Sequence, residues 1–291
     1  VESYDFTVDH TGPKGNPTSA ASTYVLSEDL KTVETLLGKG SSRTIRLPKG
    51  HYMLDSTLNT GQGDNTRSFK LFHSGVDLTK DTRIDLDFRR TKPVDIRPPK
   101  QAGELLIEHA SHTLRSGGEQ VTALTTASQP HELFTGHVGP PLPPERLDAA
   151  VGGEWSGKQG SYHLAWLREG KVPSGLRRSV EQRDLATVRH EIGPTGPDRE
   201  TTLSNLASRG RASTAIGTAV PVPVRGTHTS FYNTDDGVRW TTNLTRMNGQ
   251  EIETSLNAPP RGYQPGREYR YEFNHTPFGP GFPETALAEP P

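Results

Sequence analysis

The alternation of apolar and polar residues in residues 83–88 (RIDLDF) constrains the fold of this chain more than any other feature. Successive side chains of a β-strand point to opposite faces of a sheet, so this alternation predicts a strand with one buried face and one wet face. Asp85 and Asp87 are expected on the wet face. Residues 44–58 (TIRLPKGHYMLDSTL) follow the same pattern, and two strands are expected to meet at the Pro-Lys-Gly turn of residues 48–50. An apolar face of this kind builds a scaffold and performs no chemistry of its own.

The composition extends this pattern to the whole chain. Its 291 residues include 30 glycines and 24 prolines, which lie between short apolar runs and form no collagen-like repeat. Glycine and proline interrupt strands and form turns. Only 30% of the residues are hydrophobic. In a chain of this length, that is enough to bury a core when each strand has one apolar face and one polar face. Many short strands separated by turns predict an all-β protein of the β-sandwich class.

Two tandem β-sandwich units are predicted, residues 1–98 and residues 99–291, divided at the stiff Pro-Pro pair 98–99. The length is that of one large domain or two ordinary ones. In the second unit, the Asp-Gly pair within residues 233–237 is typical of a tight turn and predicts a hairpin there. The apolar spacing of residues 30–37 fits a short helix and a strand equally well.

The charge balance argues against two classes of partner. With 33 basic and 34 acidic residues the net charge is −1, so the chain has no long-range field to gather nucleic acid or anionic lipid. Aromatic residues make up 7% of the chain, which is too few for a base-stacking platform. The apolar runs are too short to span a bilayer. We therefore expect no nucleic-acid partner and no membrane partner.

The chain contains no cysteine, which excludes disulfides and thiolate metal sites. The absence of cysteine is compatible with secretion as well as with the cytosol. The sequence starts at Val1, and no charged and then apolar leader follows it. We therefore expect a fragment whose targeting signal lies outside this sequence.

No motif of nucleophilic catalysis is present. A Ser-His-Asp site needs its serine on a strained turn beside oxyanion donors, and the sequence has no Gly-x-Ser-x-Gly. A triad assembled without such a motif stays open as an alternative. His109 and His112 are three residues apart, which in a strand places their rings on opposite faces, and a zinc site needs at least three protein ligands. The sequence predicts neither a catalytic residue nor a zinc site.

Acidic residues in glycine-containing loops are the candidates for an ion site. Asp64, Asp235 and Asp236 are placed so that carboxylate and carbonyl oxygens could converge on calcium, although neither loop matches the twelve-residue calcium pattern. The alternative is that they are ordinary solvated turn residues. Asp85 and Asp87 lie about 7 Å apart along a strand, but the wet sheet face already explains them. No cofactor other than calcium is expected.

Four aromatic residues are candidates for binding. Trp155, Trp166 and Tyr232 are candidates for a sugar-binding platform, although a tryptophan on an alternating strand is more often a core residue. Phe278 lies in the Pro- and Gly-rich tail of residues 277–291, which cannot bury it alone. We therefore expect Phe278 to contact a partner that this chain lacks.

Several segments resemble the region that follows the catalytic domain in large secreted bacterial subtilisin-like serine peptidases. The resemblance begins with residues 43–54 (RTIRLPKGHYML) and residues 81–96 (DTRIDLDFRRTKPVDI). It continues in the same order through residues 179–192 (SVEQRDLATVRHEI), 230–244 (SFYNTDDGVRWTTNL) and 262–283 (GYQPGREYRYEFNHTPFGPGFP). The first unit also resembles transthyretin-like and carboxypeptidase-regulatory modules, in which a Gly-x-Tyr strand packs into a sandwich.

This resemblance implies a non-catalytic accessory region of a secreted peptidase. The Asp, His and Ser motifs of subtilases are absent, so no catalytic residue carries over to this chain. The implied partner is the subtilisin-like catalytic domain of the same precursor, and the implied roles are docking to it, presenting protein substrate and holding the enzyme at the cell wall. Two alternatives stay open, a carbohydrate- or wall-binding module and a hydrolase whose site is assembled between the two units.

Overall fold

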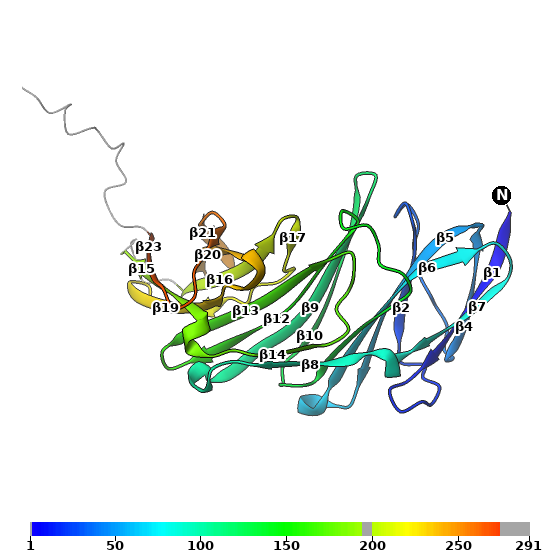
Figure 1. Ribbon diagram of the computed structural model, residues 1–291, viewed down its shortest axis with the longest axis horizontal. Coiled ribbons are helices and arrows are strands. Elements are labelled where there is room, and N and C mark those ends of the chain that lie inside the picture. The colour runs from blue at the N-terminus through cyan, green and yellow to red at the C-terminus, as the bar shows by residue number, and fades with distance from the viewer. Residues whose placement is uncertain (1, 194–199, 274–291) are drawn as a thin grey trace, which may run out of the picture.

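The protein is built almost entirely from β-strands (Figure 1). The computed structural model describes residues 2–193 and 200–273, which form 23 strands and five short 3-10 helices. No α-helix occurs in these two ranges. The predicted all-β class is therefore confirmed. The alternative of a helix within residues 30–37 is wrong, because this segment contains the short strand β3 (Val33–Thr35).

Four sheets contain these strands, and we number them I to IV in the order in which they stack. Sheet I is the smallest, and its central strand pairs antiparallel with one neighbour and parallel with the other. Sheet II has seven strands. In spatial order, sheet I consists of β4 (Ser42–Pro48), β1 (Ser3–Thr11) and β7 (Thr82–Asp87), and sheet II consists of β14 (Leu176–Ser179), β8 (Lys92–Arg97), β11 (Leu133–Val138), β6 (Arg67–Leu78), β5 (Gly50–Thr60), β2 (Ser22–Ser27) and β3.

The strands of sheets III and IV all lie between Glu104 and Phe273. Sheet III has seven strands and sheet IV has six. Sheet III consists of β10 (Glu119–Ala127), β9 (Glu104–Ser116), β12 (Leu147–Gly157), β13 (Gly160–Glu169), β19 (Gly226–Asn233), β15 (Leu185–Ile192) and β23 (Glu268–Phe273). Sheet IV consists of β17 (Ala212–Ser213), β16 (Glu200–Arg209), β20 (Arg239–Asn248) and β21 (Glu251–Asn257), with β18 (Val220–Pro221) paired to β16 and β22 (Arg261–Gly262) paired to β20.

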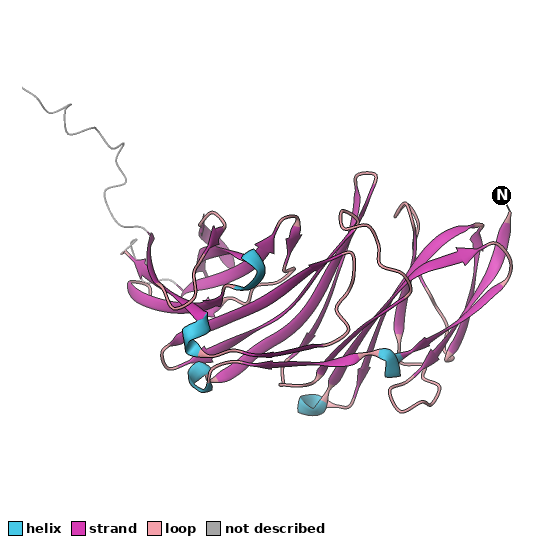
Figure 2. Ribbon diagram, in the orientation of Figure 1, coloured by secondary structure: helices cyan, strands magenta, loops and turns pink. Residues whose placement is uncertain are grey.

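The five 3-10 helices are single turns in the connections between strands (Figure 2). A single turn of this kind buries little surface and leaves the sheets as the only source of a large core. The helices are η1 (Gly63–Asn65), η2 (Phe88–Arg90), η3 (Lys100–Ala102), η4 (Gln182–Asp184) and η5 (Asp235–Gly237).

The sheets stack face to face, and each contact between neighbouring sheets encloses a hydrophobic core. Phe6 and Leu86 of sheet I pack with Leu54 and Leu71 of sheet II, which forms the sandwich predicted in the first unit. The opposite face of sheet II packs on sheet III, where its residues Leu26, Met53 and Phe72 cluster with Leu114, Leu147 and Ala149. The second face of sheet III packs on sheet IV through a cluster that includes Ala165, Tyr232, Ala207 and Trp240.

Because of this stacking, the central strands of sheets II and III are buried on both faces. Residues 147–155 of β12 are buried without exception. In β5, Tyr52, Met53, Leu54 and Asp55 are all buried in succession. A wet face survives on β7 of the outer sheet I, where Asp85 is exposed and Leu86 is buried. The predicted alternation is therefore confirmed for residues 83–88 and wrong for β5, because a second sheet covers the face that was expected to be wet.

Two predicted turns connect sheets instead of closing hairpins. The Pro-Lys-Gly turn of residues 48–50 leads from β4 in sheet I to β5 in sheet II. The predicted hairpin across residues 233–237 is wrong, because β19 belongs to sheet III and β20 to sheet IV. Turn residues specify where a chain reverses, and the choice of sheet depends on which face the next strand can bury.

The two predicted units share a sheet. Strand β8, at the end of residues 1–98, lies between β11 and β14, both of which come from residues 99–291. Strand β11 also pairs in parallel with β6 from Leu133 to Val138. The chain therefore folds back into sheet II after the Pro-Pro pair at residues 98–99.

Candidate functional site: a buried polar network between sheets III and IV

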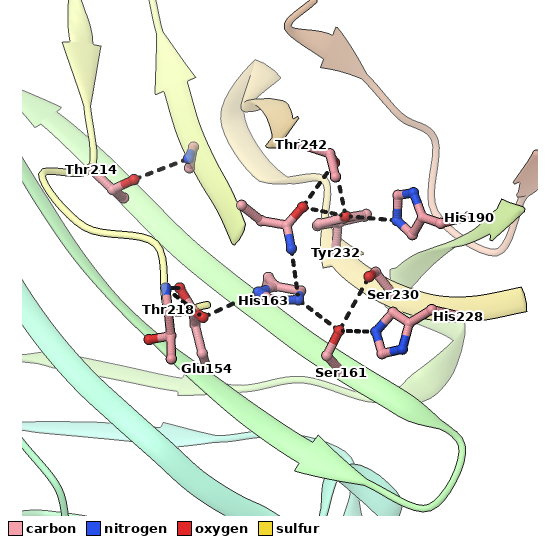
Figure 3. A network of polar contacts seen from close by, with 12 residues as sticks. Glu154, Ser161, His163, His190, Thr214, Thr218, His228, Ser230, Tyr232 and Thr242 are labelled. Atoms are coloured by element: carbon pink, nitrogen blue, oxygen red, sulfur yellow. Dashed lines mark hydrogen bonds and ion pairs between the residues drawn. The ribbon is translucent and has the colours of Figure 1, made fainter. Parts of the chain in front are cut away.

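Buried polar side chains gather on the face of sheet III that covers sheet IV (Figure 3). They come from β12, β13, β15 and β19 of sheet III and from β16 and β20 of sheet IV. Buried polar groups require partners, because an unpaired one costs about 1–3 kcal/mol. The network is defined by Glu154, Ser161, His163, His190, Asn205, His228, Ser230, Tyr232 and Thr242.

Ser161, His163 and Glu154 contact one another in the order of a hydrolase triad. Ser161 Oγ lies 2.8 Å from His163 Nε2, and His163 Nδ1 lies 3.5 Å from Glu154 Oε2. Asn205 Nδ2, which can only donate, lies 3.0 Å from the same Nε2. His163 Nε2 is therefore an acceptor, and the ring proton resides on Nδ1, facing Glu154. The backbone N–H of Thr218 donates to both oxygens of Glu154 at 3.1 Å and fixes the carboxylate.

His228 and Ser230 complete the surroundings of the Ser161 hydroxyl. Because Ser161 gives its single proton to His163, His228 Nε2 is the donor in its 2.9 Å contact with Ser161 Oγ. Ser230 Oγ lies 3.2 Å from Ser161 Oγ. Burial, together with the nearby His163, lowers the pKa of His228 to about 4, so this ring is neutral near pH 7.

Tyr232 joins the two sheets at the centre of the network. Its hydroxyl donates to Asn205 Oδ1 at 2.7 Å, and Thr242 Oγ1 donates to the same oxygen at 2.8 Å. His190 Nε2 lies 3.2 Å from the Tyr232 oxygen and donates to it. Burial, reinforced by neighbouring histidines, lowers the pKa of His190 to about 3, and burial raises the pKa of Tyr232.

The local sequence explains why these side chains share a face. In β13, Tyr162, Leu164 and Trp166 point to sheet II and Ser161 and His163 point to sheet IV, as the alternation of a strand requires. Strand β12 pairs Glu154 directly with His163, which brings the carboxylate beside the ring. Close packing at the start of β13 then demands glycine at residue 160, because a Cβ there would lie 2.0 Å from the Thr229 carbonyl oxygen.

The triad-like order does not make an open active site. Acyl transfer needs a carbonyl carbon about 3 Å from the serine oxygen and from an oxyanion donor. Ser161 is 1% exposed, His163 is 0% exposed and Glu154 is 3% exposed, so no substrate in solution reaches them. The arrangement is instead tied to sheet IV, because His163 bonds to Asn205 of β16. All three residues lie within residues 99–291, so the geometry does not support the alternative of a hydrolase site assembled between the two predicted units.

A roomy cleft opens elsewhere in the molecule. Its volume is about 670 Å³, and Phe134 and Phe69 stack at 4.6 Å between ring centroids in its wall, beside Lys14 and Arg67. The cleft is lined by residues of sheet II and its loops and contains no member of the buried network. Charged and aromatic groups line it, but no nucleophile is paired with a base there.

The predicted aromatic platform is wrong for the three residues that the structure describes. Trp155 is 4% exposed, Trp166 is 5% exposed and Tyr232 is 0% exposed. The two tryptophans pack in the core between sheets II and III, and Tyr232 packs between sheets III and IV. They bury their rings because both faces of sheet III are covered. Phe278 lies outside the described residues.

The structure does not bring the calcium candidates together. Asp235 accepts a hydrogen bond from Asn233 Nδ2 at 2.8 Å, and Asp236 is exposed with φ of 52°. The side chain of Asp64 lies outside the described part of the structure. Within the described ranges, no group of three His, Asp or Glu residues is placed to hold a metal ion. His109 and His112 lie on opposite faces of β9, as their spacing predicts, since His112 contacts Asp55 of sheet II and His109 lies beside Gly152.

The sequence carried a signal for part of the network that motif searching missed. Ser161 and His163 are two residues apart in an alternating strand, so they share a face. The acidic Glu154 precedes them across a short turn at residues 158–159. Asn205, Tyr232 and Thr242 join only through the packing of two sheets, which no local pattern reveals.

Within the described ranges, no helix combines the length and the apolar character needed to cross a membrane. No protein-family model matches the chain, and no curated protein matches it significantly.

Comparison with solved structures gives weak similarities. The Bacillus anthracis TIE protein is 12% identical, with a TM-score of 0.21, over 94% of this chain and 51% of that protein. A streptococcal ancillary pilin is 9% identical, with a TM-score of 0.21, over 92% of this chain and 98% of that chain. The major pilin subunit BcpA of Bacillus cereus is 9% identical, with a TM-score of 0.20, over 94% of this chain and 99% of that chain. The chain thus spans about half of the TIE protein, and similarity at this level carries no argument about function.

Proposed function

We propose that this chain is a non-catalytic structural module of a longer extracellular protein. One observation carries the proposal: each residue of the Ser161–His163–Glu154 arrangement is at most 3% exposed, and His163 in turn bonds to Asn205 of sheet IV. Serine, histidine and glutamate side chains catalyse hydrolysis in some enzymes, but here they provide hydrogen-bond partners for one another in the buried interior. Hydrophobic clusters join sheet I to sheet II, sheet II to sheet III and sheet III to sheet IV, so the four sheets pack against one another without interruption.

The parent protein in this proposal is a secreted subtilisin-like peptidase. The order in which the resembling segments follow one another along the chain supports this assignment. The module docks to the catalytic domain of the same precursor and presents protein substrate or holds the enzyme at the wall. A four-sheet stack suits such a role, because mutually buried sheets keep a fixed distance between their ends. The geometry favours this role over glycan binding by Trp155 and Trp166, which are core residues.

The test begins with the open reading frame around this chain. The proposal expects an upstream subtilase domain, and a reading frame with no peptidase domain contradicts the assignment. The full precursor is then compared with a version that lacks residues 1–291. The expected result is retained cleavage of a short peptide and reduced cleavage of protein substrate or reduced wall retention.

Binding of the separate chain gives an independent readout. Residues 1–291, added to the precursor that lacks them, are expected to bind it in calorimetry, and an unrelated β-sandwich of similar size is the control. Unchanged behaviour of the deleted precursor, together with no binding, contradicts the docking role.

A further inference from the structure

A second cluster of buried charges lies between sheets II and III. Asp55 comes from β5 and Lys70 from the adjacent strand β6, and both side chains are only 5% exposed. His112 of β9 reaches across from sheet III, with 2% of its side chain exposed. The Phe72 and His112 rings meet edge to face, with their centroids 5.2 Å apart. The cluster has no role in the network between sheets III and IV.

The lysine approaches the carboxyl group in an unusual way. Lys70 Nζ contacts Asp55 Oδ1, yet Oδ1 is a buried atom whose contact lacks hydrogen-bond geometry. The amine and the carboxyl group are therefore in close contact without a well-formed hydrogen bond between Nζ and Oδ1. Thr57 Oγ1 accepts from Lys70 Nζ at 3.4 Å and holds it in place. The other carboxyl oxygen, Oδ2, lies 3.4 Å from His112 Nε2.

Energetics makes a simple ion pair a costly solution at this position. Removing two charges from water costs several kcal/mol for each ion, and only excellent geometry with further hydrogen bonds offsets it. Burial raises the pKa of Asp55, but Lys70 and His112 outweigh burial and hold that pKa well below its usual range. A covalent amide would remove both charges and satisfy the same contacts without desolvated ions.

We propose that Lys70 and Asp55 condense into an intramolecular isopeptide bond that joins β5 to β6. Nucleophile and acceptor are held in contact in a site closed to water, which supplies the proximity that a slow condensation needs and opposes the reverse hydrolysis. The only reactants are the two side chains, and the only product besides the amide is one water molecule.

The bonds and protons of this step balance. The Lys70 ammonium gives one proton to the Asp55 carboxylate that it contacts, which leaves a neutral amine and a neutral carboxyl group. Nζ attacks Cγ, and the Nζ–Cγ bond forms. The Cγ–Oδ2 bond then breaks, and Oδ2 leaves as water after taking the second amine proton through His112. His112 ends in its starting protonation state, and its contact with Oδ2 makes it the catalytic residue of the step.

Intact mass spectrometry of the purified full chain tests the proposal. The expected mass is lower than the sequence mass by one water molecule. Lys70→Arg is the matched control, because a guanidinium keeps the positive charge but does not acylate under these conditions, and its mass is expected to equal its own sequence mass. A tryptic digest locates the bond, since the proposal expects no cleavage after Lys70 and a branched peptide that joins the segments of Asp55 and Lys70.

Folding of the control is checked by circular dichroism, and if Lys70→Arg does not fold, the tryptic map of the unmodified chain alone decides the matter. A full sequence mass for the folded protein after prolonged incubation at neutral pH overturns the proposal. A branched peptide that joins any other pair of residues also overturns it.

Discussion

Replacing Tyr232 by Phe removes one oxygen from the middle of the network and nothing else. The hydroxyl is fully buried, donates to Asn205 Oδ1 at 2.7 Å and accepts from His190 Nε2 at 3.2 Å. In its absence Asn205 Oδ1 keeps Thr242 as a donor, but His190 Nε2 loses the acceptor at that position. One buried group left without a partner costs about 1–3 kcal/mol, so Tyr232→Phe is expected to lower the free energy of unfolding by that amount.

Urea denaturation followed by tryptophan fluorescence measures this loss. The midpoint is expected to fall with an unchanged slope, because the folded surface does not change. Tyr24→Phe is the matched control, since Tyr24 is 46% exposed, and it is expected to stay within about 0.5 kcal/mol of the unmodified chain. Equal stabilities of Tyr232→Phe and Tyr24→Phe would refute the reasoning that this network binds sheet III to sheet IV.

Three further predictions concern the pH dependence of stability, the close packing at Gly152 and the burial of Trp155. The pKa of His190 is lowered to about 3 and that of His228 to about 4, from 6.5. Below pH 6.5 the unfolded chain therefore binds more protons than the folded chain. As the pH falls from 6.5 to the folded pKa, the free energy of unfolding is expected to fall by roughly 1.4 kcal/mol per histidine per pH unit. Urea titrations at several pH values should show this slope, and a free energy of unfolding that does not change with pH would contradict it. Gly152→Ala should destabilise the fold, because its Cβ would lie 2.5 Å from a carbonyl oxygen of β13, whereas Gly40→Ala meets only ordinary contacts; equal melting temperatures would disprove this. Trp155→Ala should cost about 3–5 kcal/mol in the same assay, as expected for a core residue and not for a surface platform, and a loss under about 1 kcal/mol would count against core packing.

Local patterns predicted the strands well where one face of a sheet stays open to water. Residues 83–87 alternate because β7 belongs to the outer sheet I and the face that carries Asp85 is exposed. The all-β class follows from the same patterns, because glycine and proline punctuate the chain throughout. The turns at residues 48–50 and 233–237 were also located correctly.

Local patterns failed where a strand is buried on both faces. In β5 the buried Asp55 follows the apolar Leu54 and looks from sequence like a wet-face residue, yet it contacts Lys70 and His112. Strand periodicity reports the two faces of a strand but not what lies on each of them. The same limit explains the wrong hairpin at residues 233–237, where the strands before and after the turn enter different sheets.

Only part of the buried polar network could be predicted from the sequence. The spacing of Ser161 and His163 places them on one face, and this could have been read from the alternation of β13. The sequence predicts Tyr232 as a surface aromatic, whereas in the structure its hydroxyl contacts Asn205 and Thr242 of sheet IV. Contacts between sheets are long-range, so they follow from the stacking and not from any one segment.

Labelling of Ser161 by a fluorophosphonate probe tests the central claim most directly. Such probes phosphonylate a serine hydroxyl only when it is activated and accessible, and Ser161 contacts His163 but is closed to solvent. We predict that the folded chain stays unlabelled in intact mass spectrometry, as does Ser161→Ala. A folded chain that gains the probe at Ser161, with the gain lost in Ser161→Ala, would contradict a structural role for this network.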